Sequence, residues 1–155
     1  MADKENTIKN YSQTWPMPKK LSPIIIIGTG GIVKDAHLPA YKKAGFEVHG
    51  LYDVDSEKAK NLAKEFGITN VFDSLEEAFQ NKDHIFDLAL PPANLLEVVE
   101  KLPENICAVF QKPLGRSLEE GNKIRKICHQ KNIKACMNFQ LRFSPISLPV
   151  YEAIK

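Results

Sequence analysis

Two glycines follow an apolar run at a spacing that suits the binding of a phosphate group. The β-branched run Ile24–Ile27 leads directly into Gly28-Thr29-Gly30-Gly31-Ile32. Such glycines let the backbone turn tightly, and they let a pyrophosphate approach the N–H groups at the start of the next helix, where the helix dipole favours an anion. Glycines are common in any tight turn between a strand and a helix, and the third position of this fingerprint is Val33. The glycine motif alone is therefore weak evidence for a phosphate-binding site, and a second feature is needed to support it.

An acidic residue at the end of the next predicted strand supplies that feature. Asp53 lies 25 positions after Gly28, at the end of a strand predicted over 47–53. A carboxylate there accepts hydrogen bonds from the ribose hydroxyls of adenosine and repels a 2′-phosphate. The glycine turn and Asp53 together predict a dinucleotide site that takes NAD, with NADP less favoured. We interpret the neighbouring Asp55 as the cap of the following helix.

The elements that must position these residues alternate along the chain. The apolar runs predict strands over 24–27, 47–53, 71–72, 87–90, 106–111 and 134–138. Helices are predicted between them, and Ser74 and Ser117 each begin a capping box. The run 24–27 has no polar break, so it must be covered on both faces and is expected to be a central parallel strand. The alternation predicts an α/β, doubly wound Rossmann fold with a mainly parallel six-stranded sheet.

Length and composition exclude several classes of protein. The chain has 155 residues, of which 43% are hydrophobic and 26% charged, so a disordered or fibrous chain is excluded. A net charge of only +2 argues against nucleic acid or a membrane surface as a partner bound through bulk charge. We expect no membrane span and no signal peptide. Three cysteines without paired spacing indicate reduced thiols and a cytoplasmic location.

Several further motifs are ordinary alone and specific in combination. Beside the glycine turn and Tyr52-Asp53-Val54-Asp55, the chain carries His37-Leu38-Pro39, Leu90-Pro91-Pro92, Gln111-Lys112-Pro113-Leu114 and Asn138-Phe139-Gln140-Leu141-Arg142-Phe143-Ser144-Pro145. From about Ile24 to its last residue, the chain resembles the N-terminal half of the glucose–fructose oxidoreductase / inositol dehydrogenase / MocA-like family of nicotinamide-dependent dehydrogenases.

The resemblance gives Lys112 a role in catalysis. Lys112 follows an apolar strand, and ligands of open α/β sheets bind at the carboxyl ends of the strands. The resemblance implies that this lysine lies near the nicotinamide and helps to transfer the proton of the substrate hydroxyl. Gln111 stands where the family has glutamate, which removes a charge that could pair with Lys112. The residues expected at the cofactor are Gly28, Thr29, Gly30, Gly31, Ile32, Asp53, Leu90, Pro91, Gln111, Lys112, Pro113 and Arg142.

Other residues are interpreted as structural, and for Arg142 two interpretations stay open. Arg142 fits either a contact near the nicotinamide or an ion pair at a domain junction. We interpret His37 as structural rather than catalytic, and Cys128 as a buried thiol on an apolar helix stripe. The basic residues over 123–131 are expected to form a solvated helix face. The histidines and cysteines lack metal-ligand spacing, so no metal site is expected.

The resemblance also implies the organisation of the protein. Family members are longer, because an α+β domain that supplies most of the substrate pocket and the oligomer interface follows the nucleotide domain. We expect an N-terminal arm over 1–21, a Rossmann domain over 22–145 and the start of a linker helix over 146–155, with the C-terminal α+β domain absent. The full-length protein is expected to be a homo-oligomer.

The implied function is that of an NAD(P)-dependent oxidoreductase. Its substrate would be a secondary alcohol of a sugar, cyclitol or related polyol, from which a hydride passes to the cofactor. The chain itself is expected to bind dinucleotide with little or no turnover. The alternative is a stand-alone nucleotide-binding sensor or interaction module without dehydrogenase activity, and another Rossmann ligand such as a nucleotide-sugar also stays open.

Overall fold

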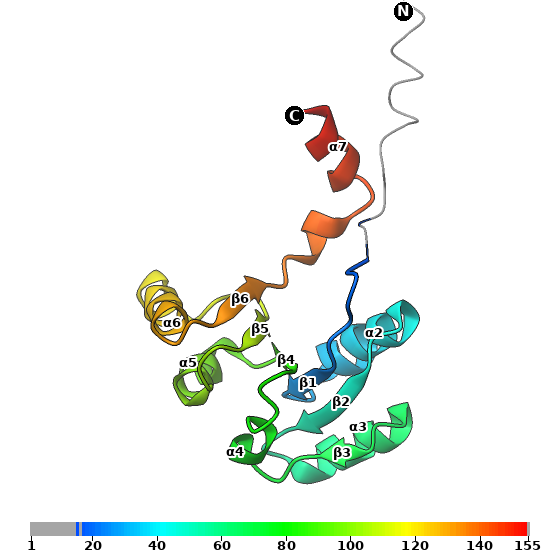
Figure 1. Cartoon of the computed structure of the whole chain (residues 1–155), viewed down its shortest axis with the longest axis vertical. Coiled ribbons are helices and arrows are strands. Elements are labelled where there is room, and N and C mark those ends of the chain that lie inside the picture. The colour runs from blue at the N-terminus through cyan, green and yellow to red at the C-terminus, as the bar shows by residue number, and fades with distance from the viewer. Residues whose placement is uncertain (1–14, 16, 155) are drawn as a thin grey trace, which may run out of the picture. The chain divides into compact units, whose positions relative to one another are not determined.

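Six parallel strands form one sheet within residues Leu21–Asn138 (Figure 1). In the order β3-β2-β1-β4-β5-β6, every neighbouring pair is parallel. The strands are β1 (Ile24–Ile27), β2 (Val48–Tyr52), β3 (Asn70–Val71), β4 (Ile85–Leu88), β5 (Cys107–Phe110) and β6 (Lys134–Met137). This structure, a computed structural model, describes Trp15 and residues 17–154. The predicted doubly wound Rossmann fold is confirmed.

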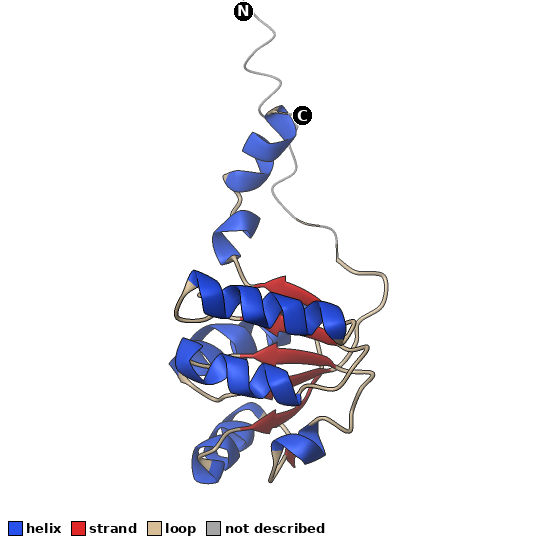
Figure 2. Ribbon diagram, turned by 90° about the vertical axis from the view of Figure 1, so that its left-hand side faces the viewer, coloured by secondary structure: helices blue, strands red, loops and turns tan. Residues whose placement is uncertain are grey.

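Helices lie on both sides of the sheet (Figure 2). A π-helical turn, η1 (Val33–His37), continues into α2 (Leu38–Ala44) and so makes up the helix predicted after the glycine turn. The other helices of this unit are α3 (Ser56–Phe66), α4 (Leu75–Ala78), α5 (Pro92–Lys101) and α6 (Leu118–Gln130). The predicted caps are confirmed, because the side chains of Asp55, Ser74 and Ser117 each accept a hydrogen bond from the first turn of the helix that follows.

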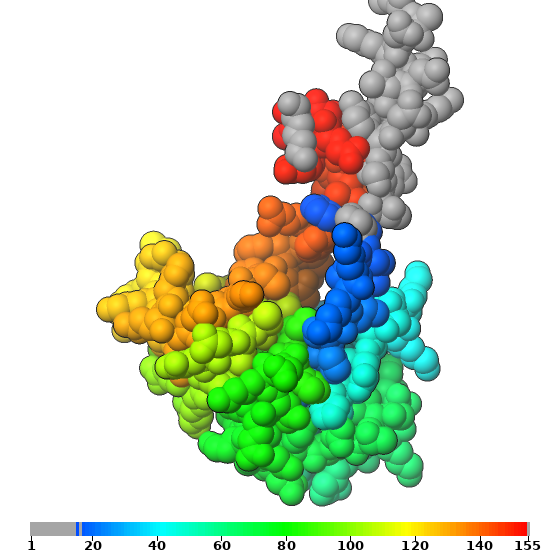
Figure 3. Space-filling model, viewed as in Figure 1, coloured from blue at the N-terminus to red at the C-terminus, as the bar shows by residue number. Residues whose placement is uncertain are grey.

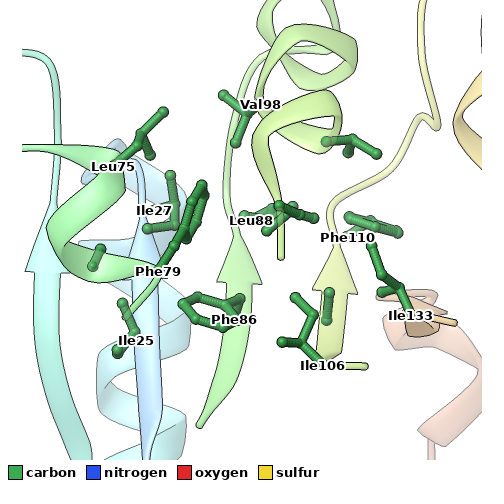
Figure 4. Close-up of a cluster of buried hydrophobic side chains, with 14 of the residues drawn as sticks. Ile25, Ile27, Leu75, Phe79, Phe86, Leu88, Val98, Ile106, Phe110 and Ile133 are labelled. Atoms are coloured by element: carbon green, nitrogen blue, oxygen red, sulfur yellow. The ribbon is translucent and has the colours of Figure 1, made fainter. Parts of the chain in front are cut away.

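The strand β1 is the centre of two hydrophobic cores. All four of its isoleucines are buried, with at most 3% of their surface exposed, which confirms the central position predicted for this run. Ile25 and Ile27 face a core that also contains Phe86, Leu88 and Phe110 (Figure 4). Ile24 and Ile26 face the other core, which β1 shares with residues of η1, α2, β2 and α3. Burial on both faces explains why this strand carries no polar residue.

The bounds of β4 differ from the prediction of a strand over 87–90. β4 begins two residues earlier, at Ile85, and ends at Leu88. It pairs with β1 residue for residue, so that Leu88 lies opposite Ile27, the last residue of β1. Because the chain turns away at Gly28, β4 has no further partner on β1 with which to continue. The pairing register between β1 and β4 therefore sets the end of β4. The pattern of apolar residues in the sequence does not predict this register.

The described residues outside Leu21–Asn138 belong to a second unit. It contains η2 (Gln140–Phe143) and α7 (Ser147–Ala153), and the rings of Trp15 and Phe143 meet edge to face with centroids 5.3 Å apart. Most of the arm expected over 1–21 lies outside the described residues. The predicted domain limits at 21, 145 and 146 stay predictions.

Two histidines, His49 near the start of β2 and His84 directly before β4, affect the stability of the fold in acid. The rings of His49 and His84 have centroids 4.5 Å apart. Burial of the His84 ring, and then the nearby His49, lower the pKa of His84 below its ordinary value. Because the folded chain binds this proton less readily than the unfolded chain does, the stability that neutral His84 contributes is lost as pH falls through the lowered pKa.

We therefore predict that His84→Asn makes the free energy of unfolding less dependent on pH below the ordinary histidine pKa. Urea unfolding of the wild type and the variant at several pH values between neutral and mildly acidic measures this slope. The matched control is His129→Asn, which makes the same change at an exposed site on α6. An equal slope in wild type and His84→Asn would show the prediction to be wrong.

Candidate functional site

The glycine turn leaves β1 through a space that no larger residue would fit. Gly28 has φ +95°, and a Cβ atom placed on it would lie 2.7 Å from the backbone oxygen of Ala89 and 3.1 Å from a side-chain carbon of Leu90. On its other side, the Gly28 N–H donates to the Tyr52 carbonyl at 2.7 Å. The turn is thus held between the ends of β2 and β4. The requirement for glycine here is set by contact with backbone as well as by φ.

Open space and free donors follow directly after this tight passage. A Cβ atom on Gly30 would meet no atom within 4 Å. The N–H groups of Val33 and Lys34 both donate to the Gly30 carbonyl, at 3.0 and 3.3 Å, and these are the first bonds of the helix. The N–H groups of Gly31 and Ile32 precede them, at the positive end of the helix dipole. This arrangement suits an anion such as a pyrophosphate.

Asp53 is bonded to the glycine turn itself. Its Oδ2 accepts from the N–H of Thr29 at 2.6 Å and from the Thr29 hydroxyl at 2.7 Å, and its Oδ1 accepts from the N–H of Asp55 at 3.0 Å. Burial acts to raise the pKa of the Asp53 carboxyl, but these hydrogen bonds from Asp55 and Thr29 lower it below its usual value. The ionised carboxylate therefore ties the end of β2 to the turn after β1.

The segment after β5 reaches the same edge of the sheet. The N–H of Gln111 donates to the Leu88 carbonyl at 3.3 Å, and the Gln111 side chain is buried. Lys112 and Pro113 follow as exposed residues joined by a cis peptide bond. Because the carboxyl ends of parallel strands share one edge, the predicted residues lie there in the order Asp53, glycine turn, Leu90 and Gln111–Lys112, after β2, β1, β4 and β5 respectively.

A buried polar cluster beneath this edge involves residues that the sequence did not identify as a group. Asp87 of β4 is fully buried, and its Oδ2 lies 2.6 Å from Nδ1 of His37 and accepts from the Tyr41 hydroxyl at 2.8 Å. The other ring nitrogen of His37 lies 2.6 Å from Nε2 of Gln111. The signal for this cluster was an acidic residue inside the apolar run Ile85–Leu90, since a carboxylate in a buried strand requires donors.

Three further predictions concern Arg142 and two residues of α6. Arg142 is exposed on η2, in the second unit, and both of its interpretations stay predictions. Cys128 is buried as predicted, and burial raises the pKa of its thiol. On the basic face of α6, Lys123 is exposed and pairs with Glu119 at 2.9 Å, which agrees with a solvated face.

Two kinds of feature are missing from the part of the chain that the structure describes, Trp15 and residues 17–154. There, no three His, Cys, Asp or Glu side chains come together in a way that could hold a metal ion. None of the helices formed by these residues has the length and apolar character needed to cross a membrane.

β6 is the last strand of the sheet, and its residues Lys134 to Cys136 are exposed; this segment is orange in Figure 3.

Comparison with known proteins agrees with this fold. Residues 23–139 match a family model described as an oxidoreductase family with an NAD-binding Rossmann fold. The fold and this family match therefore define an NAD-binding domain of an oxidoreductase. The chain belongs to the GFO_IDH_MocA family. The resemblance inferred from the motifs is confirmed, whereas the alternative of a stand-alone sensor module finds no support in these comparisons.

The similar proteins are longer than this chain. Glucose-6-phosphate 3-dehydrogenase of Bacillus subtilis is 28% identical over 131 residues, which are 79% of this chain and 35% of that protein. The crystal structure of an oxidoreductase from Thermotoga maritima is 26% identical, with a TM-score of 0.70 over 76% of this chain and 38% of that one. The WlbA dehydrogenase of Chromobacterium violaceum, solved with NADH and UDP-GlcNAcA, shares the fold at 21% identity, with a TM-score of 0.67 over 82% of this chain and 37% of that one. The chain spans 31–39% of the length of the curated relatives it matches.

We predict that Gly28→Ala destabilises the chain more than Gly45→Ala does. Both glycines have positive φ, +95° and +74°, and strain of this kind costs about 1–3 kcal/mol. A Cβ atom at position 45 meets nothing within 4 Å, whereas one at position 28 meets the backbone of Ala89. Denaturant unfolding of the two variants isolates the effect of that contact. Equal losses of unfolding free energy would show that the contact relaxes without penalty.

Proposed function

We propose that this chain is the cofactor-binding half of an NAD-dependent dehydrogenase that oxidises a secondary alcohol of a sugar, cyclitol or related polyol. The observation that carries the proposal is the order of groups along the carboxyl edge. A carboxylate after β2, an anion-binding turn after β1 and a lysine after β5 match in order an adenosine ribose, a pyrophosphate and a nicotinamide. Membership of an NAD-binding oxidoreductase family supports it.

The residues of the glycine turn fit the pyrophosphate. Gly28 directs the chain between two strand ends, and the open space at Gly30 leaves room for a phosphate close to the backbone. The free N–H groups of Gly31 and Ile32 would donate to its oxygens. Thr29 is 3% exposed and holds Asp53 through two hydrogen bonds, so its part is to fix the turn and the ribose-binding residue together.

Asp53 determines the choice between NAD and NADP. A carboxylate has about four lone-pair sites, and Thr29 and Asp55 use three of them. The capacity that remains accepts a ribose hydroxyl, and the negative charge that the lowered pKa maintains repels a 2′-phosphate. We therefore propose NAD as the cofactor.

The nicotinamide side of the site is built by the segments after β4 and β5. Backbone groups of Leu90 and Pro91 would line the cofactor, since their side chains offer no polar atom. Gln111, Lys112 and Pro113 complete that side in our proposal. When bound, NAD supplies the hydride acceptor. The exposed amine of Lys112 hydrogen-bonds the substrate hydroxyl and assists the loss of its proton.

The name of one relative supports the substrate class. The Bacillus subtilis protein is named as a 3-dehydrogenase of glucose 6-phosphate, a sugar derivative. Because the chain spans 31–39% of the curated relatives, we place most of the substrate pocket, and the interface of a homo-oligomer, in the part of a full-length protein beyond the nucleotide domain. Three free cysteines support a cytoplasmic location.

We predict that residues 1–155 bind NADH and show little or no dehydrogenase turnover. Binding is measured as a change in the fluorescence of NADH on titration with the protein, with heat-unfolded protein as the control. Turnover is measured by NADH formation from NAD and a panel of hexoses, inositols and sugar phosphates. Failure to bind NADH would contradict the cofactor role, and robust turnover would contradict the place that we give to the substrate pocket.

We predict that Asp53→Asn weakens NAD binding about tenfold, the usual effect of losing a charge-assisted hydrogen bond. NADP binding changes less or improves, because the repulsion of the 2′-phosphate is removed. Calorimetric titration with both dinucleotides measures the NAD-to-NADP ratio. The matched control is Asp55→Asn, which makes the same chemical change two residues away and retains a good helix cap. Wild-type protein that binds NADP more tightly than NAD would refute this role of Asp53.

A further inference from the structure

A line of buried hydrogen bonds runs from the middle of β4 to the residue before Lys112. Asp87 is 0% exposed, His37 7% and Gln111 9%. Asp87 Oδ2 and His37 Nδ1 are 2.6 Å apart, and His37 Nε2 and Gln111 Nε2 are also 2.6 Å apart. Nδ2 of Asn138, just after β6, lies 3.4 Å from the same Nε2 of His37. Side chains from within β4 and from just after β5 and β6 thus converge on the imidazole of one helical residue.

The chemistry of the partners fixes the form of the His37 ring. The same Asp87 oxygen accepts a hydrogen bond from the Tyr41 hydroxyl, so it is an acceptor, and Nδ1 of His37 donates a hydrogen bond to it. The tautomer of a neutral imidazole follows from the bond that its other nitrogen makes. Nε2 then accepts from the side-chain amide of Gln111. Asp87 therefore orients the ring, and the ring orients Gln111.

This line joins the two halves of the proposed cofactor site. His37 ends the π-helical turn η1, part of the helix whose first N–H groups stand at the glycine turn. Gln111 directly precedes Lys112, whose own side chain is exposed. A π-helical turn inside a longer helix often occurs at a functional site. Here it lies in the helix that brings His37 to the segment carrying Lys112.

We propose that His37 is a positioning residue for Gln111 and Lys112: its ring, oriented by Asp87, holds this segment in the geometry that receives the nicotinamide. The inference rests on the proposed function, because it concerns the nicotinamide half of the same site. The adenosine half is held separately, by Asp53 and Thr29. Loss of the His37–Gln111 bond therefore affects binding of nicotinamide and leaves binding of the adenosine half unchanged.

Two variants remove the bond from opposite ends. The amide nitrogen of an asparagine at position 37 takes the place of Nδ1, so His37→Asn retains donation to Asp87 and loses the acceptor Nε2. Gln111→Met retains the length and burial of the side chain and loses the amide donor. His129→Asn, on the exposed surface of α6, controls for the histidine-to-asparagine change. Thermal melting of each variant shows whether it folds.

The affinities for NADH and for ADP-ribose separate the two halves of the site. We expect each variant to bind NADH about 5- to 10-fold more weakly, while ADP-ribose affinity stays within about twofold of the wild type. The double variant should lose no more than either single one, since both changes remove the same bond. Equal losses for NADH and ADP-ribose, or an unchanged NADH affinity in both variants, would overturn the proposal.

Nuclear magnetic resonance of the ligand-free chain tests the link independently of the cofactor. The ¹⁵N shifts of the His37 ring should show a protonated Nδ1 and an unprotonated Nε2, and His37→Asn should move the backbone amide signal of Lys112. A ring protonated on Nε2, or an unmoved Lys112 signal, would overturn the proposal. Wild-type protein that binds neither ligand but passes both spectroscopic tests would refute the proposed function and leave the link from His37 to Lys112 established.

Discussion

The close approach of Gly28 to the backbone of Ala89 is the constraint on which the site depends. At this point β1 ends, and the chain passes between the ends of β2 and β4 with space for a hydrogen atom and nothing larger. The same passage sets the last pair between β1 and β4, Ile27 with Leu88. It also brings Thr29 within hydrogen-bond distance of Asp53. The absence of a side chain at Gly28 thus determines where β1 and β4 end and where the Asp53 carboxylate lies.

The local patterns predicted most of the fold. The unbroken run Ile24–Ile27 is central and buried, and the caps Asp55, Ser74 and Ser117 begin their helices as predicted. These features could be predicted because neighbouring residues determine them. The bounds of β4 could not be, because they depend on register with a strand about sixty residues away in sequence and on the turn that ends it.

Part of the candidate site could likewise be predicted from the sequence, and part could not. Motifs close in sequence predicted the glycine turn and the acidic residue after β2, and the structure brings Thr29 and Asp53 together at 2.6 Å. The contact among His37, Asp87 and Gln111 could not be predicted, because it joins a helix to two strands through side chains separated by 50 and 74 positions. Their burial made partners necessary, but only the fold determines which partners they have.

The central position of β1 also bears on the order in which the protein folds. Every buried member of the core on the Ile24 and Ile26 face, except Ala89, comes from residues 24–63, so this core is nearly complete in the chain before β4 is synthesised. The opposite face, with Ile25 and Ile27, takes most of its cover from residues 86–133. During synthesis from the N-terminus, one side of β1 therefore closes early while the other stays exposed to water.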